Sequence, residues 1–243
     1  PPNQPPHTMA KPLGFIIDQG LSPIDGSPYV AIMTLNSTNR KTGKMLQIWI
    51  LRRDINPVAA IQTGADVSVC GDCPHRKQDD GSRSCYVNVG QAPLSVYKSF
   101  KRGRYVSPTS EQLKAAVAGH RVRFGAYGDP AILHGSVVSE IISYADGHTG
   151  YTHQWRSDFA TQFKNVFQAS CDGFSDYFAA STAGWKTFSV VPRGYTPAKI
   201  KQCPATVTDS KAQCNTCALC DGAKAHIYVE AHGSGAKYVT ALA

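Results

Sequence analysis

The chain has 243 residues, of which 42% are hydrophobic, and a formal net charge of +8. A chain of this length buries roughly 70% of its unfolded surface, so it needs no disulfides to fold. No apolar run approaches the ~20 residues that cross a bilayer, which argues against a membrane protein. The proline-rich segment 1–12 lacks the apolar core of a signal peptide, and we therefore expect a cytoplasmic protein.

The first part of the chain predicts an extension followed by a β-hairpin. We expect the segment before Gly20 to be loose, at least as far as the apolar stretch 13–17. Strands are expected at 29–35 and 45–51, with a turn between them. Asn56 and Pro57 then open a short helix that Gly64 ends.

From residue 65 onward, predicted strands alternate with predicted helices. The expected strands are 65–69, 121–127, 150–155, 166–171, 186–191, 199–202 and 225–231, and the expected helices are 94–100, 111–118, 137–144 and 176–183. Such alternation indicates βαβ units.

The predicted fold is therefore α/β, a partial (β/α) barrel with a mostly parallel sheet. An N-terminal β-hairpin precedes the barrel and a C-terminal cysteine-rich cluster region follows it. The expected parts are an extension with the hairpin at 1–64, the barrel core at 65–202, and the cysteine-rich region with the last strand at 203–243.

Seven of the eight cysteines fall into two sets. The first set is Cys70, Cys73 and Cys85, and the second is Cys203, Cys214, Cys217 and Cys220. Cytosolic cysteines stay reduced, and clustered ones are more often metal ligands than bridges. The remaining cysteine, Cys171, is expected to be a small buried apolar residue.

The second set is close to the bacterial ferredoxin pattern for a cubane iron–sulfur cluster, with three cysteines at two-residue gaps and a remote Cys-Pro. Structural zinc more often uses two separated pairs, and zinc remains the alternative. In the first set, three cysteines can hold a [4Fe–4S] cluster and leave one iron open to a ligand. The competing interpretation makes His75 the fourth ligand of a closed zinc site.

Polar residues follow the ends of several predicted strands, where chemistry sits in parallel α/β folds. Gly128 and Asp129 follow one strand, and this turn either approaches a ligand or only caps a helix. His153 lies in the last residues of the next strand and suits proton transfer near neutral pH, although a lone histidine is usually structural. Asp172 follows a third strand, where it contacts a ligand or caps a helix.

A basic group at a predicted helix end comprises Lys98, Lys101, Arg102 and Arg104. Cations complement a helix C-terminus, so solvated charge is the default interpretation. The alternative is contact with nucleic-acid phosphates, which the net charge also favours. Thiolates bound to metal would offset part of that charge.

The order of these motifs resembles that of radical S-adenosylmethionine (SAM) proteins, and the chain also looks like uncharacterised phage and prophage proteins with this pattern. A loop carries three cysteines, Gly128-Asp129-Pro130 is similar to the family's Gly-Gly-Glu-Pro-like motif, and Ser170-Cys171-Asp172-Gly173 resembles its Ser-x-Asp-Gly motif. The C-terminal cysteines match an auxiliary cluster. The cysteine gaps in the first loop, two and eleven residues, differ from the family's usual spacing.

The resemblance implies one or two [4Fe–4S] clusters and SAM as a further cofactor. It places SAM against Gly125, Gly128, Asp129 and Ser170, and it turns His153, Gln154 and Asp172 toward the substrate. The activity implied is that of a radical oxidoreductase or transferase with unknown substrate. Two alternatives remain open, a non-enzymatic, zinc-stabilised nucleic-acid-binding protein of a phage or mobile element, and a redox or scaffold protein that keeps its clusters without binding SAM.

Overall fold

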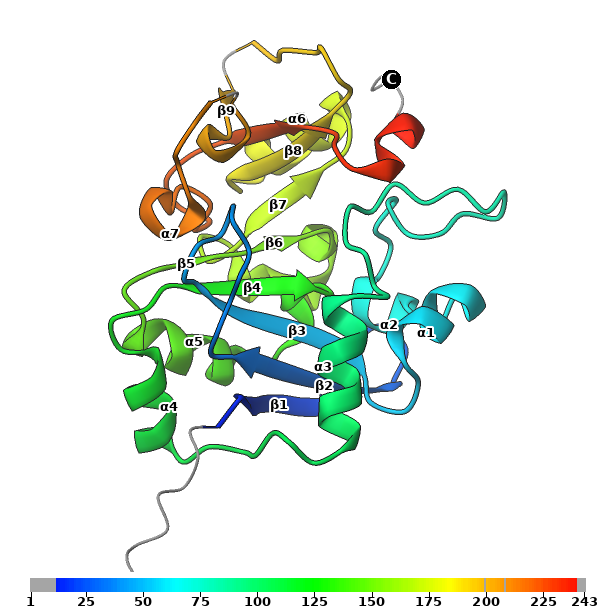
Figure 1. Ribbon diagram of the computed structural model, residues 1–243. Coiled ribbons are helices and arrows are strands. Elements are labelled where there is room, and N and C mark those ends of the chain that lie inside the picture. Colours follow the sequence, from blue (N-terminus) through cyan, green and yellow to red (C-terminus); the bar gives the residue numbers. More distant parts are fainter. Residues whose placement is uncertain (1–11, 199, 208, 240–243) are drawn as a thin grey trace, which may run out of the picture.

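The computed structural model describes residues 12–198, 200–207 and 209–239, and it contains two five-stranded sheets. Sheet A has the order β1-β2-β3-β4-β5, and Figure 1 shows it in the lower half of the molecule. Its strands are β1 (Gly14–Leu21), β2 (Pro28–Thr34), β3 (Leu46–Arg52), β4 (Val122–Tyr127) and β5 (His148–Thr149). β1, β2 and β3 pair antiparallel, whereas β3, β4 and β5 pair parallel.

Sheet B continues from sheet A and is parallel at every pairing. Its order is β6-β7-β8-β10-β9. The strands are β6 (Tyr151–Thr152), β7 (Gln168–Cys171), β8 (Thr187–Val191), β9 (Lys201–Gln202) and β10 (Ile227–Glu230). Gly150 alone separates β5 from β6, so one stretch of chain joins the two sheets. The last strand, β10, inserts between β8 and β9.

Short helices connect the strands, and α3 crosses the front of sheet A in Figure 1. The α-helices are α1 (Pro57–Thr63), α2 (Val67–Cys70), α3 (Ala92–Lys101), α4 (Ser110–Val117), α5 (Gly135–Tyr144), α6 (Phe174–Thr182) and α7 (Cys214–Cys217). Short 3-10 helices cover Pro130–Ile132, Gln154–Arg156, Asp158–Phe163, Pro204–Thr206 and Ser234–Tyr238. Within the described residues, no helix is long and apolar enough to cross a membrane.

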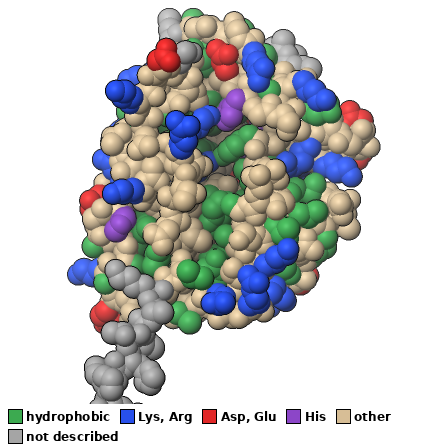
Figure 2. Space-filling view, viewed as in Figure 1, with side chains coloured by type: hydrophobic (Ala, Val, Ile, Leu, Met, Phe, Trp, Pro, Cys, Tyr) green, Lys and Arg blue, Asp and Glu red, His purple; other side chains and the backbone are tan. Residues whose placement is uncertain are grey.

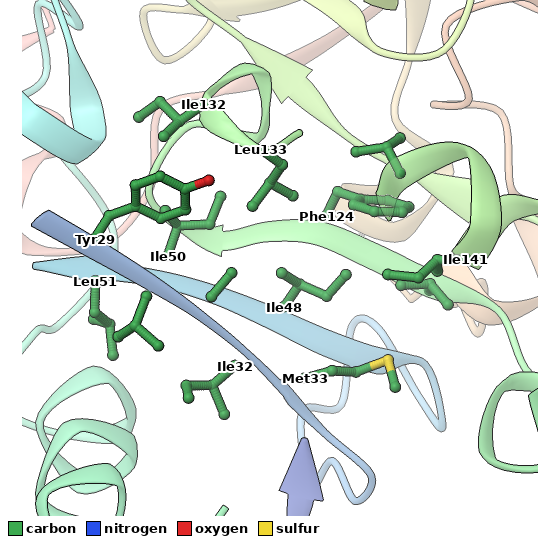
Figure 3. Close-up of a cluster of buried hydrophobic side chains, with 14 of the residues drawn as sticks. Tyr29, Ile32, Met33, Ile48, Ile50, Leu51, Phe124, Ile132, Leu133 and Ile141 are labelled. Carbon is green, nitrogen blue, oxygen red and sulfur yellow. The ribbon is translucent and has the colours of Figure 1, made fainter. Parts of the chain in front are cut away.

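The main core lies on sheet A, where β2 and β3 are almost entirely buried. Figure 3 shows Ile48 and Ile50 of β3 on the same side of the sheet as Phe124 of β4 and Ile141 of α5, whereas Ile32 of β2 lies on the other side. A smaller cluster under sheet B packs Trp155 and Trp185 around Cys171. The two sheets therefore rest on separate apolar centres, with the larger one fixing β3 and β4.

The predicted α/β class is confirmed, and so are the hairpin of β2 and β3 and the parallel pairing of the later strands. The helix after Asn56 is also confirmed. The Asn56 side chain accepts hydrogen bonds from two main-chain N–H groups, and Gly64 ends the helix with φ +77°. The partial barrel is not confirmed, because the described strands form two open sheets with β1 and β9 at the outer edges.

Two predictions near the N-terminus are wrong within the described residues. The segment expected to be loose before Gly20 forms β1, which pairs with β2 and sets Asp18 within 2.9 Å of the Tyr29 hydroxyl. The segment 65–69, expected as a strand, contains the start of helix α2. Its polar positions look like a solvated strand face, but they are buried against partners. Ser68 donates to Asp25, and Asp66 pairs with Arg76.

The strand expected at 150–155 is also too long. Pairing stops at Thr152, and the chain turns into a 3-10 helix at Gln154. The Asp129 carboxylate accepts a hydrogen bond from the main-chain N–H of His153, which fixes this turn.

Candidate metal centre

A cavity of about 230 Å³ lies at the carboxyl ends of the parallel strands, and both cysteine sets reach it. Cys70, Cys73 and Cys85 line one part of its wall, and Cys203 and Cys214 line another. Figure 2 shows a hollow on this face of the molecule, with hydrophobic side chains inside it. Residues far apart in sequence thus share one cavity.

The first cysteine set begins where α2 ends at Cys70. Gly71 follows with φ +60°, a conformation that side-chain-bearing residues rarely adopt. A Cβ there would lie 2.1 Å from Nε2 of Gln154, so a larger residue would have to displace the Gln154 amide. The same Gln154 nitrogen donates to the carboxylate of Asp72 at 2.7 Å. Gln154 therefore supports the loop between Cys70 and Cys73 from behind.

The eleven residues between Cys73 and Cys85 form an excursion that returns to its start. Figure 1 shows the segment between α2 and α3 projecting at the right of the molecule. The main-chain N–H of Cys85 donates to the His75 carbonyl at 2.9 Å, which closes the excursion. Arg83 binds the carbonyls of Cys85 and Val87 from within it. The wide sequence gap therefore still brings three sulfurs to one cavity wall.

The second set is assembled from three anchoring contacts. The Cys203 N–H donates to the Tyr228 carbonyl at 2.8 Å, which ties it to β10. Cys214 opens α7, and its N–H donates to the Lys41 carbonyl in the loop between β2 and β3. The Cys220 carbonyl accepts from Gly150 at the junction of the two sheets. Four cysteines from one irregular segment are thereby held against both sheets.

All eight cysteines are free thiols. Burial raises the pKa of Cys70, and the neighbouring thiols of Cys73 and Cys85 raise it further. Burial likewise raises the pKa of Cys220, although Tyr151 opposes this by hydrogen bonding, and the thiols of Cys203, Cys214 and Cys217 add to the rise. Neighbouring thiols of the same set thus add to the rise in the pKa of Cys70 and of Cys220.

The sulfurs of each set nevertheless stay apart. Across the described ranges, three ligand atoms from His, Cys, Asp or Glu come within 4.8 Å of one another at one place only, made by His75, His153 and Asp172. Neither cysteine set has three sulfurs within 4.8 Å of one another among the described residues.

Two arginines line the cavity without a carboxylate partner among the described residues. Arg83 and Arg123 each leave Nε buried and without a hydrogen bond. The Arg123 guanidinium donates to the Tyr86 hydroxyl, next to Cys85 in sequence. Although burial raises the pKa of Cys214, the charge of Arg123 opposes that rise, and Arg83 acts in the same way on Cys85. Each cysteine set thus has its own unpaired cation.

The three residues predicted to face a substrate occupy different places. His153 lines the cavity, Asp172 lies behind it, and Gln154 is buried against the cysteine loop. Burial alone would lower the pKa of His153, but contacts with Cys73 and Asp172 outweigh burial and raise it. Burial would raise the pKa of Asp172, but hydrogen bonds from His153 and His75 outweigh it and lower the value.

The four residues predicted to hold SAM all line the cavity: Gly125, Gly128, Asp129 and Ser170. The Asp129 carboxylate is already engaged, since its oxygens accept from the main-chain N–H groups of Ala131 and His153. Gly128 has φ +79°, and a Cβ there would lie 2.6 Å from the Ile50 carbonyl oxygen. Asp129 and Gly128 thus have packing roles that the sequence motif does not reveal.

Other predicted features lie outside the cavity. Cys171 is buried beside Trp155 and Trp185, as expected for an apolar residue. The four basic residues are exposed in the last turn of α3 and just after it: Lys98, Lys101, Arg102 and Arg104. Figure 2 shows several Lys and Arg side chains on the same side of the molecule.

Sequence reasoning missed Arg83, Arg123 and Tyr127 as cavity residues. The Tyr127 hydroxyl is buried without a partner, and burial together with the nearby thiols of Cys70 and Cys85 raises its pKa. A tyrosine or arginine in a predicted strand carries no signal of its surroundings. Comparison with protein-family models, curated proteins and solved structures finds no match for this chain.

Proposed function

We propose that this chain is an iron–sulfur protein that holds two cubane clusters beside one cavity and binds SAM at the first of them. The observation that carries the proposal is the convergence of two separate sets of free cysteines on a shared cavity. Disulfides would stabilise such loops in an oxidised protein, but every cysteine here is a free thiol.

The spacing of the sulfurs argues against a tetrahedral zinc site already formed in either set. Four thiolates around zinc at about 2.3 Å lie about 3.8 Å from one another. Neither cysteine set has three sulfurs within 4.8 Å of one another among the described residues. A cubane needs a wider arrangement, because each thiolate binds a different iron.

The charges around the cavity support an anionic occupant. Arg83 and Arg123 have no acidic partner among the described residues, although burying an unpaired charge is costly. Thiolate-bound iron–sulfur clusters carry net negative charge that these guanidinium groups would balance. The buried Tyr127 hydroxyl, close to Cys70 and Cys85, is a free donor for a cluster sulfur.

The first cluster would be held by Cys70, Cys73 and Cys85, and the second by Cys203, Cys214, Cys217 and Cys220. With three protein ligands, the first leaves one iron for SAM. A reduced cluster with SAM on its open iron would supply the electron that cleaves SAM. In the family that this chain resembles, this cleavage precedes hydrogen abstraction from the substrate. The chain itself would orient the bound molecules and enclose the cavity. The strand end from Gly125 to Gly128 forms one wall, and Tyr151 and Phe188 form an aromatic wall that would exclude water.

The test is anaerobic purification of the full chain with single-cysteine variants. We expect a brown protein that absorbs at about 400 nm. After reduction it should give an electron paramagnetic resonance (EPR) signal that changes when SAM is added. Cys73→Ser should lose about half of the iron and the response to SAM, and Cys217→Ser should lose about half of the iron but keep that response. Cys171→Ser is the matched control, because its thiol is buried away from the cavity.

The zinc-stabilised alternative gives a different result. A colourless protein with stoichiometric zinc, and salt-sensitive nucleic-acid binding that weakens when the exposed basic residues near α3 are replaced, would favour that alternative. A brown protein whose EPR signal does not change when SAM is added would support the redox or scaffold function instead.

A further inference from the structure

Beside the first cysteine set lies a second group of possible metal ligands that the clusters do not use. His75 comes from the excursion after α2, His153 follows β6 and Asp172 follows β7. Their ligand atoms lie within 4.8 Å of one another, the one such group of three in the described ranges. Three separate segments therefore converge on one point.

The distances suit a single ion. His75 Nε2 lies 2.7 Å from Asp172 Oδ1, and His153 Nε2 lies 2.9 Å from Asp172 Oδ2. Ligand atoms bound to one ion at about 2.1 Å and at right angles lie about 3 Å apart. The two His–Asp distances are therefore already those of neighbouring ligands of one ion, and the two imidazole nitrogens lie within 4.8 Å of each other.

The surrounding contacts hold His75 through its second ring nitrogen and His153 through its main chain. His75 Nδ1 lies 2.7 Å from the Ser84 hydroxyl, and the main-chain N–H of His153 is held by Asp129 at 2.8 Å. Histidine ligands commonly donate their second ring N–H to an oxygen in this way, which fixes the nitrogen that faces the metal. The side chains are 15%, 20% and 18% exposed for His75, His153 and Asp172, so solvent reaches the group only partly.

The charge balance also favours an ion. Among the described residues, Asp172 pairs only with these two histidines, and no lysine or arginine lies against it. An ion bound to both imidazoles would take the place of their protons as the positive partner of this carboxylate. His75 and His153 line the cavity whereas Asp172 lies behind them, so an ion among the three would have its open positions toward the cavity.

We propose that His75, His153 and Asp172 form a mononuclear site for a divalent transition-metal ion, separate from the cysteine sets and facing the same cavity. Imidazole and carboxylate ligands suit Mn²⁺, Fe²⁺ or Zn²⁺, and two histidines with one carboxylate leave positions open for substrate or water. The proposal does not depend on the iron–sulfur clusters, because it uses none of their ligands.

Mn²⁺ is the probe for the experiment, because soft thiolates select other metals whereas carboxylates suit Mn²⁺. The full chain, purified anaerobically and freed of labile ions with a chelator, is titrated with Mn²⁺ while EPR records the free ion. We expect one bound Mn²⁺ per chain. Asp172→Asn and His153→Gln should each weaken binding at least about tenfold, since even an outer-shell loss has that effect.

His134→Ala is the matched control. His134 also contacts a carboxylate, Asp18, at 2.8 Å, but no second histidine joins the pair. This variant should bind Mn²⁺ like the unaltered chain. Circular dichroism and the iron and sulfide content of the same samples check that the fold and clusters persist.

If His75, His153 and Asp172 are held together only by hydrogen bonds, the chain will not bind Mn²⁺ at this place. The proposal is overturned if the unaltered chain binds no stoichiometric Mn²⁺, or if binding survives unchanged in either Asp172→Asn or His153→Gln. Because iron and sulfide are measured in parallel, loss of the clusters and loss of this site are seen separately.

Discussion

Replacement of Gly128 by alanine tests how the cavity floor is packed. Gly128 follows β4 and has φ +79°. An added Cβ would lie 2.6 Å from the Ile50 carbonyl oxygen, 2.7 Å from the Ile50 Cβ and 3.2 Å from the Val69 carbonyl oxygen. These neighbours include main chain of β3 and α2, which cannot turn away as a flexible side chain can.

Two costs add up in this variant. The left-handed backbone conformation costs a residue with a side chain roughly 1–2 kcal/mol. Forcing an extra methyl group into packed surroundings costs about 1–3 kcal/mol more. We therefore expect Gly128→Ala to lower the free energy of unfolding by about 2–5 kcal/mol, a large part of a typical domain's 5–15 kcal/mol.

Gly119→Ala separates the two costs. Gly119 has φ +76°, almost the same conformation, and nothing lies within 4 Å of the position its Cβ would take. It should lose only the conformational part, about 1–2 kcal/mol. Urea denaturation of the metal-free chain measures both variants. Equal losses in the two would refute the packing argument and leave approach to a ligand as the reason for glycine at 128.

Three further substitutions probe local contacts. Asn56→Ala removes the cap of α1 and should cost about 1 kcal/mol in a thermal or urea melt, with no change at all contradicting the capping role. Burial lowers the pKa of His148 below its usual 6.5, so the unfolded chain takes up its proton first and stability falls as pH drops below that value. His148→Gln should therefore show a smaller loss than the unaltered chain between about pH 7 and about pH 5, and equal losses would reject this reasoning. Asp129→Asn leaves one side-chain oxygen to accept from two main-chain N–H groups, those of Ala131 and His153. Urea denaturation should show a free energy of unfolding lower by about 1–3 kcal/mol, and unchanged stability would mean that these bonds are dispensable.

Local patterns predicted the helices and strands best where the signal lay within a few residues. Asn56 and Gly64 mark the ends of α1, and the apolar runs of β2 and β3 mark the hairpin. The pattern failed at 65–69, because Asp66 and Ser68 are buried polar residues with distant partners. Those partners, Arg76 and Asp25, cannot be inferred from alternation.

The candidate site was predictable in its cysteines and less so in its surroundings. The sequence groups the thiols by spacing, and the structure brings both groups to one cavity. Gln154 lies in the last residues of a predicted strand and looks like a ligand-binding residue, yet it turns back to support Gly71 and Asp72. Arg123 alternates with apolar residues in β4 and reads as solvent-facing, although its Nε is buried. Such orientations depend on tertiary contacts that no short segment encodes.

The most direct measurement of the central claim is the iron and acid-labile sulfide content of the full chain purified without oxygen. Two cubanes correspond to about eight iron and about eight sulfide ions per chain, and this is the result we expect. Zinc in place of iron with no sulfide, bound through the same seven cysteines, would contradict the account.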